Sequence, residues 1–142
     1  MLEGTRPIDQ WMLIIELLVL VLIAYEVGAG VWRAIQTHRR VKAIFQRMSL
    51  GQDLQSKAPS GGTDEPTATA WVNSVKTWMQ ETYNLLARYS PQAAASFVHD
   101  QGGASVQYSG ITGNAQARDW YRTLISRINN LRGIMEKPEI YF

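Results

Sequence analysis

The sequence predicts an all-α protein with a single N-terminal transmembrane helix and a small helical-hairpin domain after it. Three observations support this fold class. A nearly unbroken apolar run extends from Trp11 to Trp32. Two later segments, near residues 71–89 and 115–137, repeat apolar residues every three or four positions, as one face of a helix does. Strand-like alternation is almost absent, and its one weak instance is "ASVQYSG" at 104–110.

The segment 11–32 has the length and composition of a transmembrane helix. About 20 helical residues span a hydrocarbon core of about 30 Å. Trp11 and Trp32 bracket the segment, as aromatic residues do at the two membrane interfaces. A buried helix of a soluble protein is one alternative, but the rest of the chain offers little apolar surface to surround it. A cleaved signal peptide is another, although Glu3 and Asp9 depart from the basic start of such peptides.

The distribution of cations predicts the orientation of this helix. Arg6 is the only basic side chain in residues 1–10, whereas the segment after Trp32 contains many. The positive side of a membrane helix stays in the cytoplasm. We therefore expect a single-pass protein of the cell membrane, with residues 1–10 as a short extracytoplasmic tail and the C-terminal domain in the cytoplasm.

Residues 33–55 are predicted to form a basic, amphipathic juxtamembrane helix, with Val41, Phe45 and Met48 on its apolar face. Two arrangements stay open. The helix either continues the membrane span as a rod or lies on the anionic inner leaflet. The absence of Gly and Pro between Gly30 and Ser49 favours the rod. The residues expected to contact anionic lipid are Arg33, Arg39, Arg40, Lys42 and Arg47.

Residues 56–66 have the composition of a linker, and residues 67–142 are expected to be a cytoplasmic helical domain. Thr63 or Asp64 should cap its first helix, and Ser90 should cap a short helix that Pro91 opens. Asn114 should cap the last helix, which Pro138 ends. The side chains expected to pack these helices together are Trp71, Val75, Trp78, Leu85, Trp120, Leu124, Ile128 and Leu131.

The sequence contains few residues that carry chemistry, and we expect neither a catalytic, cofactor or metal site nor a small-molecule substrate. Cysteine is absent, and the two histidines are His38 and His99. His99–Asp100 is a pair also found in metal phosphohydrolases, but those sites need further histidines and acids. The glycine-rich stretch before Asn114 lacks the phosphate-binding patterns. An enzyme is therefore not expected.

Nucleic-acid binding is also not expected. The arginines of the last predicted helix are spread around it, which is typical of a solvated face. They are Arg118, Arg122, Arg127 and Arg132.

Two carboxylates, Glu16 and Glu26, lie inside the apolar run. An ionised carboxylate in hydrocarbon costs about 2.5 kcal/mol or more at the midplane, so such residues usually face a partner or water. Both share a ridge of the helix with small residues, which let membrane helices approach closely. The two ridges are Glu16, Leu20, Ala24 and Gly28, and Glu26, Gly30 and Ala34. These faces are predicted to meet other helices, either copies of this chain or another membrane subunit.

The leading hypothesis is a non-enzymatic, single-pass membrane protein that acts as an oligomeric scaffold or as an accessory subunit of a membrane complex. The alternative is a membrane-perturbing effector or channel component, in which Glu16 and Glu26 line an aqueous path. A third, weaker hypothesis is a membrane-anchored sensor of nucleic acid or ligand. Leakage of liposomes separates the first two, and salt-dependent nucleic-acid binding tests the third.

Overall fold

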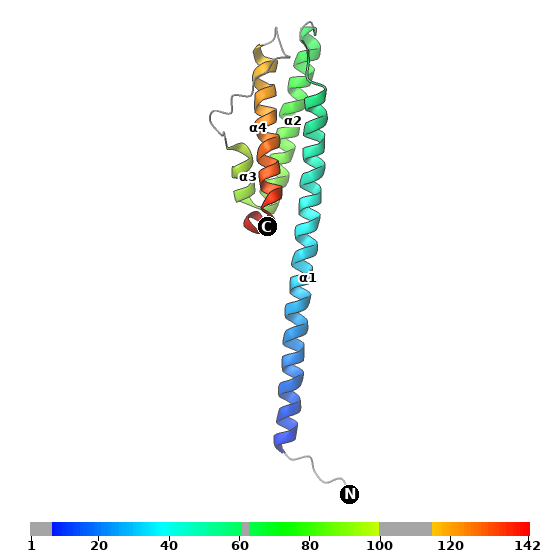
Figure 1. The fold of residues 1–142 in the computed structure, drawn as a ribbon, viewed down its shortest axis with the longest axis vertical. Helices are drawn as coiled ribbons and strands as arrows, with labels where there is room; N and C mark the ends of the chain where they lie inside the picture. Colours follow the sequence, from blue (N-terminus) through cyan, green and yellow to red (C-terminus); the bar gives the residue numbers. More distant parts are fainter. Residues whose placement is uncertain (1–6, 61–62, 100–114) are drawn as a thin grey trace. The chain divides into compact units, whose positions relative to one another are not determined.

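The computed structural model describes residues 7–60, 63–99 and 115–142, and the protein is all-α (Figure 1). The helices are α1 (Pro7–Ser56), α2 (Glu65–Tyr89), α3 (Pro91–Val98), α4 (Ala115–Glu136) and α5 (Pro138–Tyr141). The described residues contain no strand. The strand candidate at 104–110 and the predicted cap Asn114 lie outside them.

The chain divides into two compact units between His38 and Arg39. In the first unit, α1 begins at Pro7, inside the segment predicted to be an extracytoplasmic tail. Its residues from Pro7 to Gly28 are all exposed, because no other element of the described chain covers them. The structure places one helix over residues 7–56, where the sequence left open a separate helix after the span.

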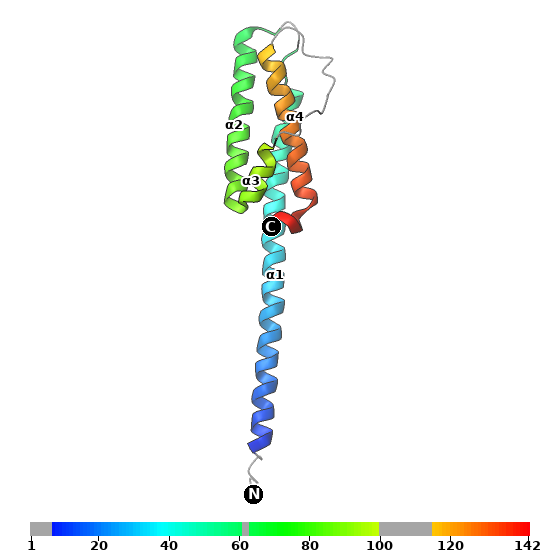
Figure 2. The ribbon, with the colours of Figure 1, turned by 90° about the vertical axis from the view of Figure 1, so that its left-hand side faces the viewer.

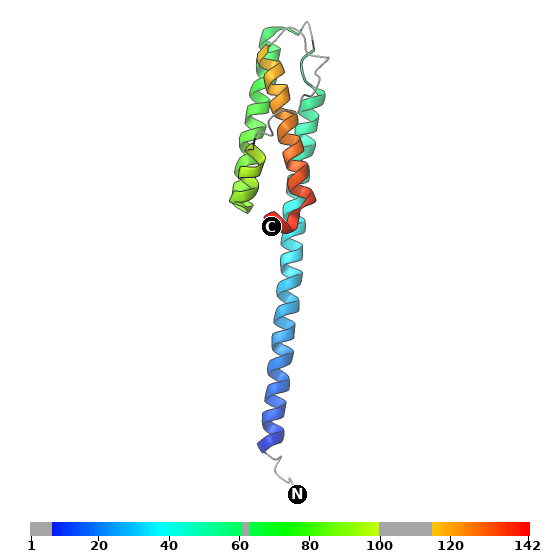
Figure 3. The same cartoon turned by 60° about the vertical axis from the view of Figure 1, so that its left-hand side comes forward.

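The second unit, Arg39–Phe142, is a bundle of the C-terminal part of α1 with α2 and α4, and α3 lies against it (Figures 2 and 3). We expected a helical domain from residue 67 onward, with residues 33–55 as a separate element. Instead, Ile44, Met48 and Gly51 of α1 are buried in the bundle. Phe45, predicted on the apolar face, is exposed. Of the predicted face, Met48 is buried as expected, whereas Ile44 is buried in place of Phe45. The buried face also includes Gly51, which has no side chain to mark it in the sequence.

The α2 helix buries one face along its whole length, at Trp71, Val75, Trp78, Thr82 and Leu86. This spacing of three and four residues keeps these positions on one side of a helix. Opposite it, α4 buries Ala117, Leu124, Ile128, Leu131 and Ile134. Phe97 of α3 is fully buried and meets the Trp78 ring edge-on, with 6.0 Å between the ring centroids. These faces form one continuous apolar core.

The helix ends follow from local sequence. Asp64, one of the two predicted caps, is the N-cap of α2, and Pro66 lies in the first turn of the helix. The Thr67 side chain beside the Asp64 carboxylate lowers the pKa of Asp64, which favours its charged form at the positive helix N-terminus. Ser90 ends α2 and caps α3, since its hydroxyl accepts a hydrogen bond of 3.3 Å from the Ala93 N–H. Pro138 follows the end of α4 and opens α5.

Candidate assembly surface

The N-terminal part of α1 is long and apolar enough to cross a membrane. Its most apolar stretch has a mean hydropathy of 2.3, and none of that stretch is buried within the chain. It is the single helix of the described residues with this character. Trp11 and Trp32, the predicted interface anchors, are both exposed.

The first predicted ridge, Glu16, Leu20, Ala24 and Gly28, is exposed along its length. A Cβ atom added at Gly28 would have no neighbouring atom within 4 Å beyond its own helix. The second ridge is equally open: Glu26, Gly30 and Ala34 are exposed, and Gly30 also has free space beside it. The structure therefore places all seven residues on surfaces that the described chain leaves uncovered.

Neither carboxylate on these ridges has a hydrogen bond or an ion pair with any other residue in the described part of the chain. In particular, no ion pair joins Glu26 to Arg33 of the same helix, although Arg33 is the first cation after the apolar run. An acid in a helix apolar enough to enter lipid needs a polar partner or water. Within the described residues neither acid has a polar partner, so a partner or water would have to come from outside them.

Two of the five cations predicted to contact lipid have protein partners in α2. Arg47 forms an ion pair of 2.8 Å with Glu81. The Arg40 guanidinium lies over the Tyr89 ring, with its carbon 5.4 Å from the ring centroid, in the geometry of a cation–π contact. Arg33, Arg39 and Lys42 are exposed. The assignment of all five to lipid stays a prediction. Arg33, Arg39 and Lys42 are the best candidates for lipid contact, because their side chains are exposed.

The predicted packing residues of the C-terminal domain do more than hold α2 to α4, because two tryptophans also bind α1. The indole N–H of Trp71 donates to the Leu54 carbonyl and that of Trp78 donates to the Arg47 carbonyl, both at 2.8 Å. Leu54 lies in the last turn of α1, where carbonyl groups have no partner within the helix. The Trp71 bond therefore also satisfies the end of α1.

Gly51 allows this contact, and its role was not predicted. A Cβ atom at position 51 would lie 2.5 Å from Cζ2 of Trp78. The indole thus lies directly on the backbone of α1, where only glycine leaves room. The one sequence signal was a glycine inside an otherwise unbroken helical pattern.

The other packing residues lie in or beside the core. Leu124, Ile128 and Leu131 are buried, as is Val75, whereas Leu85 and Trp120 are partly exposed. The Trp120 ring supports the Lys76 ammonium, which lies 5.1 Å from the ring centroid. These positions were expected from spacing alone, and the spacing predicts α2 and α4 better than it predicts α1.

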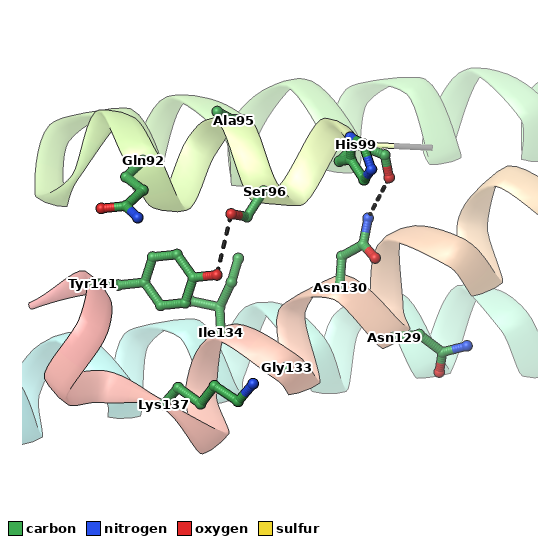
Figure 4. A pocket seen from close by; sticks show the side chains of 10 residues that line it. All are labelled: Gln92, Ala95, Ser96, His99, Asn129, Asn130, Gly133, Ile134, Lys137 and Tyr141. Carbon is green, nitrogen blue, oxygen red and sulfur yellow. Dashed lines mark hydrogen bonds between the residues drawn. The ribbon is translucent and has the colours of Figure 1, made fainter. Parts of the chain in front are cut away.

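A pocket of about 440 Å³ opens between α3, α4 and α5 (Figure 4). Two polar side chains of its lining donate hydrogen bonds: the Tyr141 hydroxyl donates to the Ser96 hydroxyl at 3.1 Å, and the Asn130 amide donates to the carbonyls of Phe97 and His99 at 2.9 Å. These bonds join α4 and α5 to α3. Asn130 was not singled out in the sequence, where nothing distinguishes it from the exposed Asn129.

Within the described ranges no three His, Asp or Glu side chains converge as a metal site would require. His99 contributes its backbone carbonyl to the contact with Asn130, and Asp100 lies outside the described residues. Comparison of the chain with family models, with curated proteins and with solved structures finds no match. The geometry of the chain is therefore the basis for a functional proposal.

Proposed function

We propose that this protein is a non-enzymatic, single-pass membrane protein that acts by assembly, as an oligomeric scaffold or an accessory subunit of a membrane complex. The observation that carries the proposal is the surface of the N-terminal part of α1. Two ridges of small residues with Glu16 and Glu26 are exposed, and neither acid has a partner in the described chain. Close helix packing and a polar contact from a neighbouring helix would satisfy both features.

The proposed partner is a second copy of this chain or a helix of another membrane subunit. The C-terminal unit, Arg39–Phe142, would then lie on one side of the membrane. The excess of cations after Trp32 supports the cytoplasm as that side. A reporter fused after Phe142 should be active in the cytoplasm, and activity outside it would reverse the orientation.

The association is tested by closing the free space at Gly28. Gly28→Ile should push neighbouring helices apart and lower the oligomer fraction measured in detergent by crosslinking. Ala29→Ile is the matched control, because Ala29 lies off both ridges and the added bulk then falls on another face of the helix. Equal oligomer fractions for the wild type and both variants would refute packing through this ridge.

The role of Glu16 is tested with two replacements. Glu16→Gln retains hydrogen bonding, whereas Glu16→Leu removes it, and interhelical polar contacts in membranes contribute about 0.5–2 kcal/mol. We expect Glu16→Gln to assemble nearly as well as the wild type and Glu16→Leu to assemble less well. Assembly that is indifferent to both changes would contradict a contact at this residue.

The two partnerless acids also support a second candidate, a membrane-perturbing effector or channel component with Glu16 and Glu26 lining an aqueous path. Liposomes that contain the pure protein stay sealed under the first proposal and leak under the second. A leak that Glu16→Gln abolishes, with the oligomer intact, would favour the channel.

A further inference from the structure

One end of the C-terminal unit gathers aromatic and basic side chains from three parts of the sequence. The Arg40 guanidinium covers the Tyr89 ring at 5.4 Å, and Tyr89 meets Phe142 edge-on, with 6.2 Å between ring centroids. These contacts bring the first turn of the unit, the end of α2 and the C-terminal residues together. We call this region the Tyr89 end. In Figures 1–3 the start of α2 and the start of α4 lie at the opposite end of the same unit.

The Tyr89 end presents apolar groups outward. Ile140 is 51% exposed, and Pro91 at the start of α3 is exposed as well. Tyr89 and Phe142 are only partly buried, although their rings meet edge to face. Amphipathic aromatic rings with an apolar neighbour fit the interface of a bilayer, where one side of the ring meets acyl chains and the other meets water.

The charge of this end is positive on balance. Arg39, Arg88 and Lys137 are exposed, and Arg40 adds a fourth cation against the carboxylates of Glu136 and Glu139. Each Lys or Arg near an anionic lipid surface contributes about 1 kcal/mol of attraction. The surface therefore combines the two terms that bind a protein to an anionic leaflet, which are exposed apolar groups and nearby cations.

The short covalent connection between the apolar run and the Tyr89 end indicates that lipid covers this surface. Arg39 and Arg40 follow Trp32 by about two helical turns of α1, and Trp32 ends the apolar run. If that run spans the membrane, the Tyr89 end is tethered close to the headgroups in every copy. We propose that the Tyr89 end rests on an anionic lipid surface, with Arg39, Arg88 and Lys137 near the phosphates and Ile140 and Phe142 at the interface. This inference rests on the membrane anchor proposed above.

The absence of cysteine from the sequence allows a direct test in the full-length protein. Ile140→Cys and, as the matched control at the exposed start of α2, Thr69→Cys each accept one fluorescent label. The labelled proteins are placed in vesicles that carry a headgroup-linked quencher, with or without phosphatidylglycerol. We expect several-fold stronger quenching at position 140 than at position 69 in anionic vesicles. Added salt should weaken the quenching at position 140, because it screens the cations.

Charge reversal then tests the electrostatic part. Lys137→Glu in the Ile140→Cys background should reduce the lipid-bound fraction at least about fivefold. Lys57→Glu makes the same change of charge at an exposed position just beyond the end of α1 and should leave the quenching unchanged. The inference is overturned if the label at position 140 is quenched no more than the label at position 69. It is also overturned if the quenching is the same with and without anionic lipid.

Two further outcomes separate this inference from the function on which it rests. Protein that floats with the vesicles but crosslinks through position 140 to a second copy, with no quenching, shows a protein interface and refutes the lipid contact alone. Protein that does not float with the vesicles refutes the anchor and therefore both proposals.

Discussion

At the scale of single residues, Gly51 and Trp78 show how one absent side chain determines the position of a helix. The indole ring occupies the space of the missing Cβ and reaches the Arg47 carbonyl. Thr82 has the opposite problem. Its side chain is fully buried, yet its hydroxyl has no hydrogen-bond partner in the described part of the chain. The two positions predict stability changes of opposite sign.

Gly51→Ala should destabilise the protein despite the better helix propensity of alanine. The gain in propensity is about 1 kcal/mol, but overpacking against the buried Trp78 ring costs about 1–3 kcal/mol. We expect a net loss of about 1 kcal/mol in the free energy of unfolding, measured by denaturant titration. Gly133→Ala in α4 is the matched control, because free space surrounds that position and the propensity gain should appear alone. Equal effects of both substitutions would contradict the contact.

Thr82→Val should stabilise the protein by about 1 kcal/mol, because it replaces a buried hydroxyl without a partner by a methyl group of similar size. The same change at the exposed Thr77 of α2 should stay within about 0.5 kcal/mol of the wild type. A loss of stability in Thr82→Val would show that the hydroxyl has a partner after all.

At the scale of helices, spacing predicts α2 and α4, because each buries a face whose apolar residues recur with the helical period. The short α3 was predicted from its cap Ser90 and from Pro91. The same reasoning could not assign residues 39–56 to the core. A helix that packs on a protein and a helix that lies on lipid both show an apolar stripe flanked by cations. Arg47 illustrates the ambiguity, since its ion pair with Glu81 depends on a residue far along the chain. The role of Asn130 could not be predicted from the sequence either, because it depends on hydrogen bonds to two backbone carbonyls that are distant in the chain.

Asn130 attaches the C-terminal end of α3 to α4, and its removal should loosen that attachment. Asn130→Ala removes the 2.9 Å bonds to the carbonyls of Phe97 and His99, although the His99 carbonyl keeps a second donor, Arg127 at 3.3 Å. The loss should cost about 1–3 kcal/mol. Asn129→Ala changes the exposed neighbour and should be nearly neutral. Thermal unfolding followed by circular dichroism compares the two, and indistinguishable midpoints would refute this role.

At the scale of the whole molecule, the second compact unit extends from Arg39 to Phe142. We predict that the folding unit begins there and not after the linker. A fragment of residues 39–142 should therefore unfold cooperatively. A fragment of residues 67–142 lacks Ile44 and Met48, which are buried in the core. Truncating a buried side chain of this size lowers the free energy of unfolding by about 2–5 kcal/mol. We expect the shorter fragment to be partly unfolded at the temperature where the longer one is folded, as measured by circular dichroism. Two fragments with the same melting temperature would place the boundary at residue 67.

Because Trp71 and Trp78 of α2 cover α1, the buried face of α1 is synthesised before the residues that cover it. The apolar run leaves the ribosome first, and the stretch with Ile44 and Met48 follows at once. Ile44 and Met48 reach their final burial only after α2 and then α4, which contributes Leu124 and Ile128, have been synthesised. The N-terminal helix is therefore available for insertion into a bilayer while the rest of the unit still lacks its final helix. If the apolar run is a membrane anchor, as proposed, targeting would act on a nascent chain whose apolar surfaces are still uncovered, at the stage when aggregation is the main hazard.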